Sequence, residues 1–335
     1  MSESIFEREI QLSQSINDFL NAECNDLNSY RNQLLTLVEE YNALLSQSEK
    51  LVKIGDATQR KLRNAKQLLE EQNEEINDKN LKLNQLNQEN ENYLKQINND
   101  LSQAVKYIHS LLPPYLKNDN IGISWKFVPS SSLGGDLFGY RWLDDENIMI
   151  FLIDVCGHGV RSALFSVSVR NTLYYMNLPN TDFHEPSSVF TGLNEMYKMK
   201  EHNDLYFTIW YGVYNVKSRE LNYSTSGHPP AFGIINGSRF ELATDNFLIG
   251  VLPQYPYISE KIIMESGTSL YIFSDGAYEI QKADNEMWTL EEMHNYLVES
   301  HTKENTELNM LYEYIQNLHI NKNIDDDFTI MKISF

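Results

Sequence analysis

The positions of the helix-breaking residues divide this 335-residue chain into two parts. All nine prolines lie at or after Pro113, and 14 of the 15 glycines lie after Gly55. Because proline interrupts helices and glycine weakens them, the first 112 residues can be helical almost throughout. We therefore predict two domains, a helical region at 1–112 and a turn-containing globular domain at 113–335.

A seven-residue apolar repeat runs through the first part. The series from Leu20 to Leu111 has 14 positions, of which 11 are apolar, whereas the chain's 41% hydrophobic content predicts about six. Such a repeat favours a left-handed coiled coil. Asn90, at one of these positions, favours a parallel dimer in register, and Gly55-Asp56 is a candidate hinge. The alternative is a single solvated helix that is partly frayed.

The excess of acidic residues limits the partners that the chain can bind. Asp and Glu outnumber Lys and Arg 47 to 27, which gives a net charge of −20. This charge repels nucleic acids and anionic membranes, and no run of 18 apolar residues is present. The N-terminus lacks the apolar segment of a signal peptide. Because its two cysteines, Cys24 and Cys156, offer no disulfide framework, we expect a cytoplasmic protein with two free thiols.

Residues 113–335 alternate short β-rich runs with Gly/Pro turns and amphipathic segments. The predicted strands are Ile121–Phe127, Asn147–Val155, Tyr206–Val216, Leu221–Ser226, Ser269–Ser274 and Phe328–Ser334. The predicted helices are Arg161–Tyr175, Ser187–Met199, Leu290–Glu299 and Glu307–Leu318. Strands in succession with helices grouped between them indicate α+β layers.

Acidic residues mark the ends of these strands. Asp136 follows a strand and two glycines, Asp154 and Asp275 each end a strand, and Asp326-Asp327 opens the last one. An ionised carboxylate next to an apolar strand is costly to bury unless it is paired or binds a metal. Carboxylate oxygens suit Mg²⁺ or Mn²⁺ better than zinc. The alternative is that each aspartate caps a turn or the next helix.

Five motifs in this domain carry a family resemblance. They are Gly134-Gly135-Asp136, Asp154-Val155-Cys156-Gly157-His158-Gly159, Ser226-Gly227-His228-Pro229-Pro230, Ser274-Asp275-Gly276 and Asp326-Asp327-Phe328-Thr329. In this order they resemble the bacterial SpoIIE/RsbU-type serine phosphatases, the prokaryotic branch of the metal-dependent PPM (2C-type) phosphatases, over about residues 105–335. Two positions depart from the family pattern: Gly139 stands where an aspartate is usual, and Cys156 where serine is common.

The resemblance implies a fold, a reaction and a set of site residues. The implied fold class is α+β, with a long N-terminal helical coiled coil followed by a PPM-type β-sandwich flanked by α-helices. Two Mn²⁺ or Mg²⁺ ions are expected at one end of the sandwich, where a metal-activated water hydrolyses a protein phosphoserine or phosphothreonine. The implied metal ligands are Asp136, Asp154, Val155 (through its carbonyl), Asp275 and Asp326, and the implied catalytic residues are Asp154, Asp275 and Asp326. Further contacts to the ligands or the phosphate are expected from Gly135, Gly157, His158, Asp327 and Arg161.

Three of the polar positions have structural alternatives. His158, between two glycines, suits a turn as well as a functional contact. His228, followed by two prolines, suits a strand-end turn that supports the sheet. Arg161, near a predicted helix N-terminus, could reach a phosphate or form a surface salt bridge.

The resemblance thus implies a protein serine/threonine phosphatase that acts in signal transduction. By analogy its substrate is a phosphorylated STAS-type anti-sigma-factor antagonist. The alternative is a catalytically weak phosphoprotein-binding or coiled-coil signalling scaffold. We expect a homodimer through the N-terminal coiled coil, which either regulates the phosphatase or only dimerises it.

Overall fold

The computed structural model describes six ranges of the chain, namely residues 7–21, 27–130, 133–282, 286–301, 306–318 and 326–335. Its backbone divides into two compact units, residues 1–94 and 95–335. Cys24 lies outside the described residues, and Cys156 is a free cysteine. None of the described helices carries an apolar segment of the length needed to traverse a lipid bilayer.

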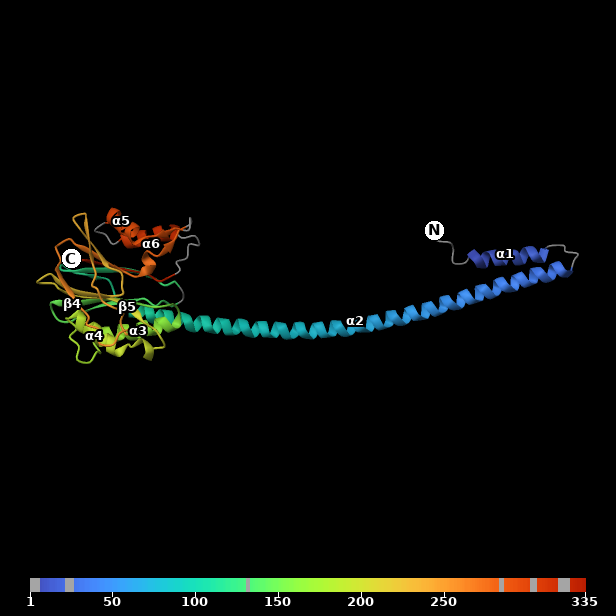
Figure 1. Ribbon diagram of the computed structural model, residues 1–335, viewed down its shortest axis with the longest axis horizontal. Coiled ribbons are helices and arrows are strands. Elements are labelled where there is room, and N and C mark those ends of the chain that lie inside the picture. Colours follow the sequence, from blue (N-terminus) through green and yellow to red (C-terminus); the bar gives the residue numbers. More distant parts are fainter. Residues whose placement is uncertain (1–6, 22–26, 131–132, 283–285, 302–305, 319–325) are drawn as a thin grey trace. The chain divides into compact units, whose positions relative to one another are not determined.

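The N-terminal unit is helical, as predicted. It contains α1 (Glu7–Asn21) and most of α2 (Leu27–Leu111), the 85-residue helix drawn in blue to green in Figure 1. The predicted hinge at Gly55-Asp56 is wrong, because α2 continues through both residues. A single glycine costs a helix only about 1 kcal/mol relative to alanine, which a helix of this length absorbs.

The second unit contains two large antiparallel sheets. In spatial order, the six-stranded sheet contains β1 (Leu116–Lys117), β2 (Gly122–Val128), β13 (Phe328–Ser334), β10 (Ser269–Phe273), β7 (Ala231–Ile235) and β8 (Ser238–Leu242). The five-stranded sheet contains β3 (Leu137–Trp142), β4 (Asn147–Val155), β5 (Phe207–Asn215), β6 (Glu220–Ser226) and β9 (Glu260–Ile263). A separate short pair is formed by β11 (Ile280–Gln281) and β12 (Met287–Trp288).

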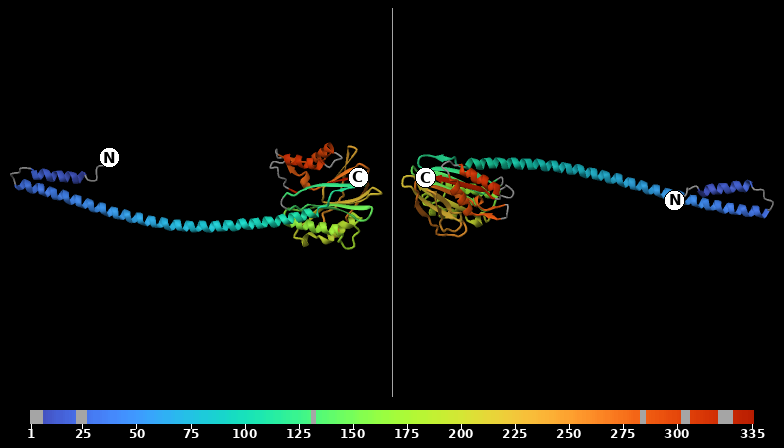
Figure 2. Two further views of the ribbon diagram at one scale, coloured as in Figure 1. Left: turned by 180° about the vertical axis from the view of Figure 1, so that it is seen from behind. Right: turned by 90° about the horizontal axis from the view of Figure 1, so that it is seen from above.

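Two pairs of helices cover the outer faces of the sandwich, one pair on each side (Figures 1 and 2). Helices α3 (Val160–Tyr174) and α4 (Pro186–Met196) pack on the five-stranded sheet. Helices α5 (Leu290–Ser300) and α6 (Glu307–Leu318) pack on the six-stranded sheet. The predicted α+β class, a β-sandwich flanked by α-helices after a long N-terminal helix, is therefore confirmed.

Strand β4 shows why the sandwich forms. Its side chains alternate between two faces, as in any strand. Ile148, Ile150 and Leu152 enter the core between the two sheets, whereas Met149 and Phe151 pack in the core beneath α3 and α4. Because both faces of β4 are covered, its sequence is apolar almost throughout.

The last turns of α2 belong to the second unit and pack beside the start of β3. Leu101, Val105 and Ile108 of α2 share an apolar cluster with Leu133 and Leu137. This contact brings α2 next to the Gly134-Gly135-Asp136 segment, which lies between those two leucines in the sequence.

Candidate active site

At one end of the sandwich the face that forms the inter-sheet core becomes polar. On β4 the inward series Ile148, Ile150 and Leu152 reaches Asp154 at its next step. The same alternation leads to polar side chains at or beside the ends of five strands, namely Asp136, Asp154, Thr208, Ser274, Asp327 and Thr329. The strands thus bring residues that are distant in sequence to one end of the core.

Asp136 is the most deeply placed of these acidic groups. It is 2% exposed, and its Oδ2 accepts a hydrogen bond from Thr329 Oγ1 at 2.5 Å. Burial raises the pKa of Asp136 well above its ordinary value, and repulsion from Asp154 and Asp327 adds to this effect. The carboxyl is therefore held where it resists ionisation unless a cation approaches.

Three further carboxyls at the same end of the sandwich also have raised pKa values. Burial, followed by repulsion from Asp275 and Asp326, raises the pKa of Asp154 to about 7. Burial also raises the pKa values of Asp275 and Asp326. We call Asp136, Asp154, Asp275, Asp326 and Asp327 the carboxylate cluster. Several carboxylates sharing one buried site remain ionised together only when positive charge balances them.

Asp327 holds the Gly134-Gly135-Asp136 segment in place. Its carboxylate accepts hydrogen bonds from the backbone amides of Gly135 at 2.5 Å, Ser130 at 2.8 Å and Asp136 at 3.3 Å, and from Ser130 Oγ at 3.1 Å. These hydrogen bonds occupy both carboxylate oxygens of Asp327. This aspartate therefore positions the segment that carries Asp136.

The two glycines of this segment are needed for close approach. A Cβ atom at Gly134 would collide with the Asp327 carboxylate. A Cβ atom at Gly135 would lie 2.7 Å from the Val155 carbonyl oxygen. The pair therefore lets the segment lie against both β4 and the start of β13.

The donor set fits hard divalent cations. Every side chain of the carboxylate cluster offers carboxylate oxygens as ligands. The Val155 carbonyl oxygen lies next to Gly135, the residue before Asp136. In the part of the chain that the structure describes, no three acidic, histidine or cysteine side chains converge as a ready-made cation site. The mutual repulsion of these carboxyls, which raises their pKa values, nevertheless matches a site that cations would stabilise.

Comparison with known proteins identifies the family of this chain. A family model described as Stage II sporulation protein E (SpoIIE) matches residues 144–335, more than half of the chain. The chain belongs to the SpoIIE family. The resemblance inferred from the five motifs is thus confirmed.

Curated relatives of this SpoIIE-family chain include two proteins of Bacillus subtilis (strain 168). Phosphoserine phosphatase RsbU is 29% identical over 155 residues, which cover 45% of each chain. Phosphoserine phosphatase RsbP is 27% identical over 182 residues, which cover 53% of this chain and 44% of RsbP. The chain matches less than half the length of either relative.

Solved structures support the SpoIIE-family fold. The SiaA-PP2C domain of Pseudomonas aeruginosa is matched with a TM-score of 0.60 at 17% identity, over 72% of this chain and 98% of that domain. The PP2C phosphatase domain and regulatory fragment of SpoIIE from Bacillus subtilis are matched with a TM-score of 0.56 at 16% identity, over 66% of this chain and 64% of that one. Both matches show the PP2C fold.

The remaining positions expected from the SpoIIE-family motifs lie around the turn after β4. Gly157 has a positive φ of 79°, and its carbonyl adjoins Gly135. His158 is exposed and close enough to Asp326 to oppose the rise of that group's pKa. Arg161 donates from Nη2 to the Asn203 carbonyl, so in this structure it tethers the segment before β5. Cys156 is partly buried and its Sγ accepts from the Tyr206 amide at 3.4 Å.

Two contributors to the SpoIIE-family site were missed by the sequence analysis. Thr329 was noted only as part of a motif, yet it donates directly to Asp136. Ser130 was not noted at all, and it supplies two of the donors to Asp327. The spacing of Asp327 and Thr329, two residues apart on one strand, was the available signal for Thr329. No pattern marked Ser130.

Proposed function

We propose that this chain is a metal-dependent protein serine/threonine phosphatase, a phosphoric monoester hydrolase that uses two Mn²⁺ or Mg²⁺ ions. The observation that carries the proposal is the carboxylate cluster, in which acidic side chains from separate strands lie at one end of a PP2C-type sandwich and raise one another's pKa values. The names of the relatives RsbU and RsbP, both phosphoserine phosphatases, support the reaction class.

In this proposal the chain's own residues hold and orient the reacting groups. The proposed ion-binding groups are the side chains of Asp136, Asp154, Asp275 and Asp326 and the backbone carbonyl of Val155. The chemistry that such ions supply when bound is activation of water and neutralisation of charge on the phosphoryl oxygens. Thr329 and Asp327 keep Asp136 at its place, and His158 lies where it can face the phosphate. No side chain is needed as the nucleophile, so Cys156 has no catalytic task.

The direct test is hydrolysis of a phosphoserine peptide by the full-length chain with added Mn²⁺ or Mg²⁺. We expect turnover that excess chelator abolishes and that returns when the metal is restored. A chain that binds the phosphopeptide without hydrolysing it under any of these conditions would instead support the scaffold alternative.

We propose that the physiological substrate is a phosphoprotein of a partner-switching circuit, a phosphorylated STAS-domain anti-sigma antagonist. The support is the similarity to RsbU and RsbP over the phosphatase part of the chain. We also propose a cytoplasmic location, in keeping with only two cysteines in the chain. The substrate test compares dephosphorylation of an intact phosphorylated STAS protein with that of a peptide carrying the same phosphoserine. Equal rates on both would contradict recognition of the STAS fold.

We further propose that residues 1–112 form a dimerisation and signalling region in front of the phosphatase domain at 113–335. Apolar side chains of the heptad series are exposed along α2, for example Leu62 at 70%, Leu69 at 61% and Leu83 at 55%. A second copy of the chain would bury this stripe in a parallel coiled coil. Light scattering on the full-length chain and on a variant without residues 1–60 tests this point, and a monomeric full-length chain would contradict it.

A further inference from the structure

The connection between β6 and β7 carries a buried histidine at the acidic end of the sandwich. Residues 227–230 pass from the five-stranded sheet to the six-stranded sheet. His228 within this connection is only 6% exposed. It therefore sits where the two sheets meet, and its ring has polar neighbours on both.

On the five-stranded sheet the neighbour is Thr208. His228 Nδ1 lies 2.9 Å from Thr208 Oγ1. Thr208 of β5 is the direct cross-strand partner of Asp154 of β4. Residues paired in this way project on the same face with their Cβ atoms about 5 Å apart. The histidine thus contacts the residue beside Asp154.

On the six-stranded sheet the neighbour is the backbone of Phe273, the last residue of β10. The ring atom Nε2 of His228 is buried and makes no well-formed hydrogen bond. Phe273 is followed directly by Ser274 and Asp275. The same imidazole therefore lies between β5, whose Thr208 pairs with Asp154 of β4, and β10, the strand that leads to Asp275.

A buried histidine costs more folding free energy than an apolar residue would at a position with a purely structural role. Burying a polar ring with one good hydrogen bond costs more than burying an apolar side chain of similar size. Burial also lowers the pKa of His228 to about 3, so that the ring is neutral and adds no positive charge near the carboxylate cluster. A neutral ring can fix the distance between two strands without taking the place of a cation.

We propose that His228, together with Thr208, is a positioning residue that sets the spacing between Asp154 on one sheet and Asp275 on the other. The consequence is that this pair tunes the affinity of the site for a divalent cation. Partners that orient metal ligands without touching the metal change affinity or activity by about 10- to 100-fold when they are removed. The inference rests on the proposed function, because it assumes that both aspartates bind metal.

The test measures Mn²⁺ binding to the full-length chain by calorimetry, without substrate. We expect His228→Leu and Thr208→Val each to weaken Mn²⁺ binding by about tenfold or more. We expect the melting temperature of the metal-free protein to change little in Thr208→Val, which replaces a hydroxyl by a methyl group. The double variant should bind no more weakly than the weaker single variant, because both act through one contact.

His294 provides a matched control. It is also buried, at 1% exposure, with an Nε2 that lacks a hydrogen-bond partner, but it lies on α5 and stacks on Phe232 of β7, with ring centroids 3.9 Å apart. His294→Leu should leave Mn²⁺ affinity unchanged. If His228→Leu folds poorly, Thr208→Val alone decides the question.

Two outcomes overturn the inference in distinguishable ways. If the wild-type chain binds Mn²⁺ and Thr208→Val binds it equally well, His228 and Thr208 have only a structural role and the proposed function stands. If the wild-type chain binds no Mn²⁺ at all, the proposed function fails and this inference fails with it.

Discussion

Acidic side chains lie at both ends of strand β4, in different surroundings. The strand spans nine residues, so its ends are about 30 Å apart. At its C-terminal end Asp154 is buried among other carboxyls, which raises its pKa to about 7. In the turn before its N-terminal end Asp144 is exposed, and hydrogen bonds from the Glu146 amide and His184 hold its pKa well below the ordinary value.

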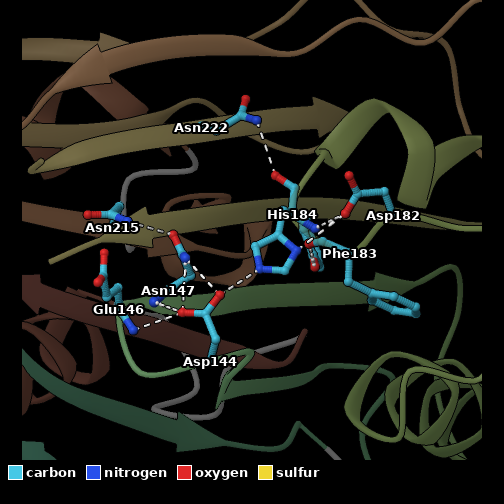
Figure 3. A network of polar contacts seen from close by, with 9 residues as sticks. Asp144, Glu146, Asn147, Asp182, Phe183, His184, Asn215 and Asn222 are labelled. Atoms are coloured by element: carbon cyan, nitrogen blue, oxygen red, sulfur yellow. Dashed lines mark hydrogen bonds and ion pairs between the residues drawn. The ribbon is translucent and has the colours of Figure 1, made fainter. Parts of the chain in front are cut away.

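Figure 3 shows the second arrangement, which we call the turn cluster (Asp144, Asp182 and His184). Asp144 Oδ1 accepts from the amides of Glu146 and Asn147, both at 2.8 Å. His184 lies between the two acids, with Nε2 2.9 Å from Asp144 and Nδ1 3.3 Å from Asp182. Asp182 Oδ1 also accepts from the His184 amide at 2.9 Å, so Asp144 and Asp182 each have a backbone donor.

The two clusters differ in how many hydrogen-bond donors their carboxylates have. In the turn cluster backbone amides and an imidazole satisfy the charges, so the arrangement stabilises the β3–β4 turn and needs no other role. In the carboxylate cluster Asp136 and Asp327 are buried, the other three acids are partly buried or exposed, and Asp327 alone of the five accepts from four donors. An arrangement that opposes folding stability is typical of sites that bind a ligand of opposite charge.

The largest expected effect is on phosphatase activity, which a change in the carboxylate cluster should abolish and a change in the turn cluster should not. Asp154→Asn should reduce phosphatase activity to background, because an amide binds hard cations poorly. Asp275→Ala and Asp326→Ala should act in the same way. The measurement is Mn²⁺-dependent hydrolysis of a phosphoserine peptide by folded protein. Asp144→Asn, the matched change in the turn cluster, should keep wild-type activity, and an active Asp154→Asn protein would refute the site assignment.

The second prediction uses the contact of α2 with Leu133 and Leu137, which flank the segment carrying Asp136. Inserting one or two residues near Lys95 rotates the upstream helix by about 100° per residue relative to this contact. If α2 regulates the site, such insertions should change activity about fivefold or more while the dimer persists.

A seven-residue insertion at the same place restores the heptad register and should restore activity. Dimer mass and specific activity are measured together for all insertions. Unchanged activity throughout would show that α2 only dimerises the chain.

The third prediction concerns stability in the absence of metal. Asp154→Asn should raise the melting temperature of chelator-treated protein by about 2–4 °C, since removing one buried like charge relieves repulsion of about 1 kcal/mol. Asp144→Asn should lower the melting temperature, and by a smaller amount because Asp144 is exposed. Calorimetry at pH 7.5 compares the two. Shifts of the same sign would remove the distinction between the clusters.

The smallest expected effect is the pH dependence of the stability that the turn cluster contributes. Because the pKa of Asp144 is lowered in the folded chain, its contribution to stability is present above the unfolded value near pH 4. This contribution is lost as pH falls through the lower folded value. The difference in melting temperature between the wild type and Asp144→Asn should therefore be constant from pH 8 to pH 5 and shrink below about pH 4. A difference that stays constant below pH 4 would contradict this role of Asp144.

Much of the fold could be predicted from local patterns. The absence of proline before Pro113 indicated the long helix, and the runs at Asn147–Val155 and Phe328–Ser334 are strands with those bounds. Strands β1, β3, β7, β8, β9, β11 and β12 were not predicted, because these short segments carry no clear alternation of apolar and polar residues. The hinge at Gly55 was wrong for the opposite reason, since a local helix breaker was outweighed by the helix on both sides.

The sequence by itself determined which residue types could make the site, because aspartates and glycines at strand ends are visible in the order of the motifs. Tertiary structure decided what each of them does. Asp327 is adjacent to Asp326, yet it accepts hydrogen bonds from the amides of Gly135 and Asp136, almost two hundred residues earlier in the sequence. Arg161, for which the sequence allows a phosphate contact or a surface salt bridge, donates to the Asn203 carbonyl in this structure. Hydrogen-bond partners and burial depend on which strands pair across the sandwich, and this pairing is a property of the whole fold that no local pattern contains.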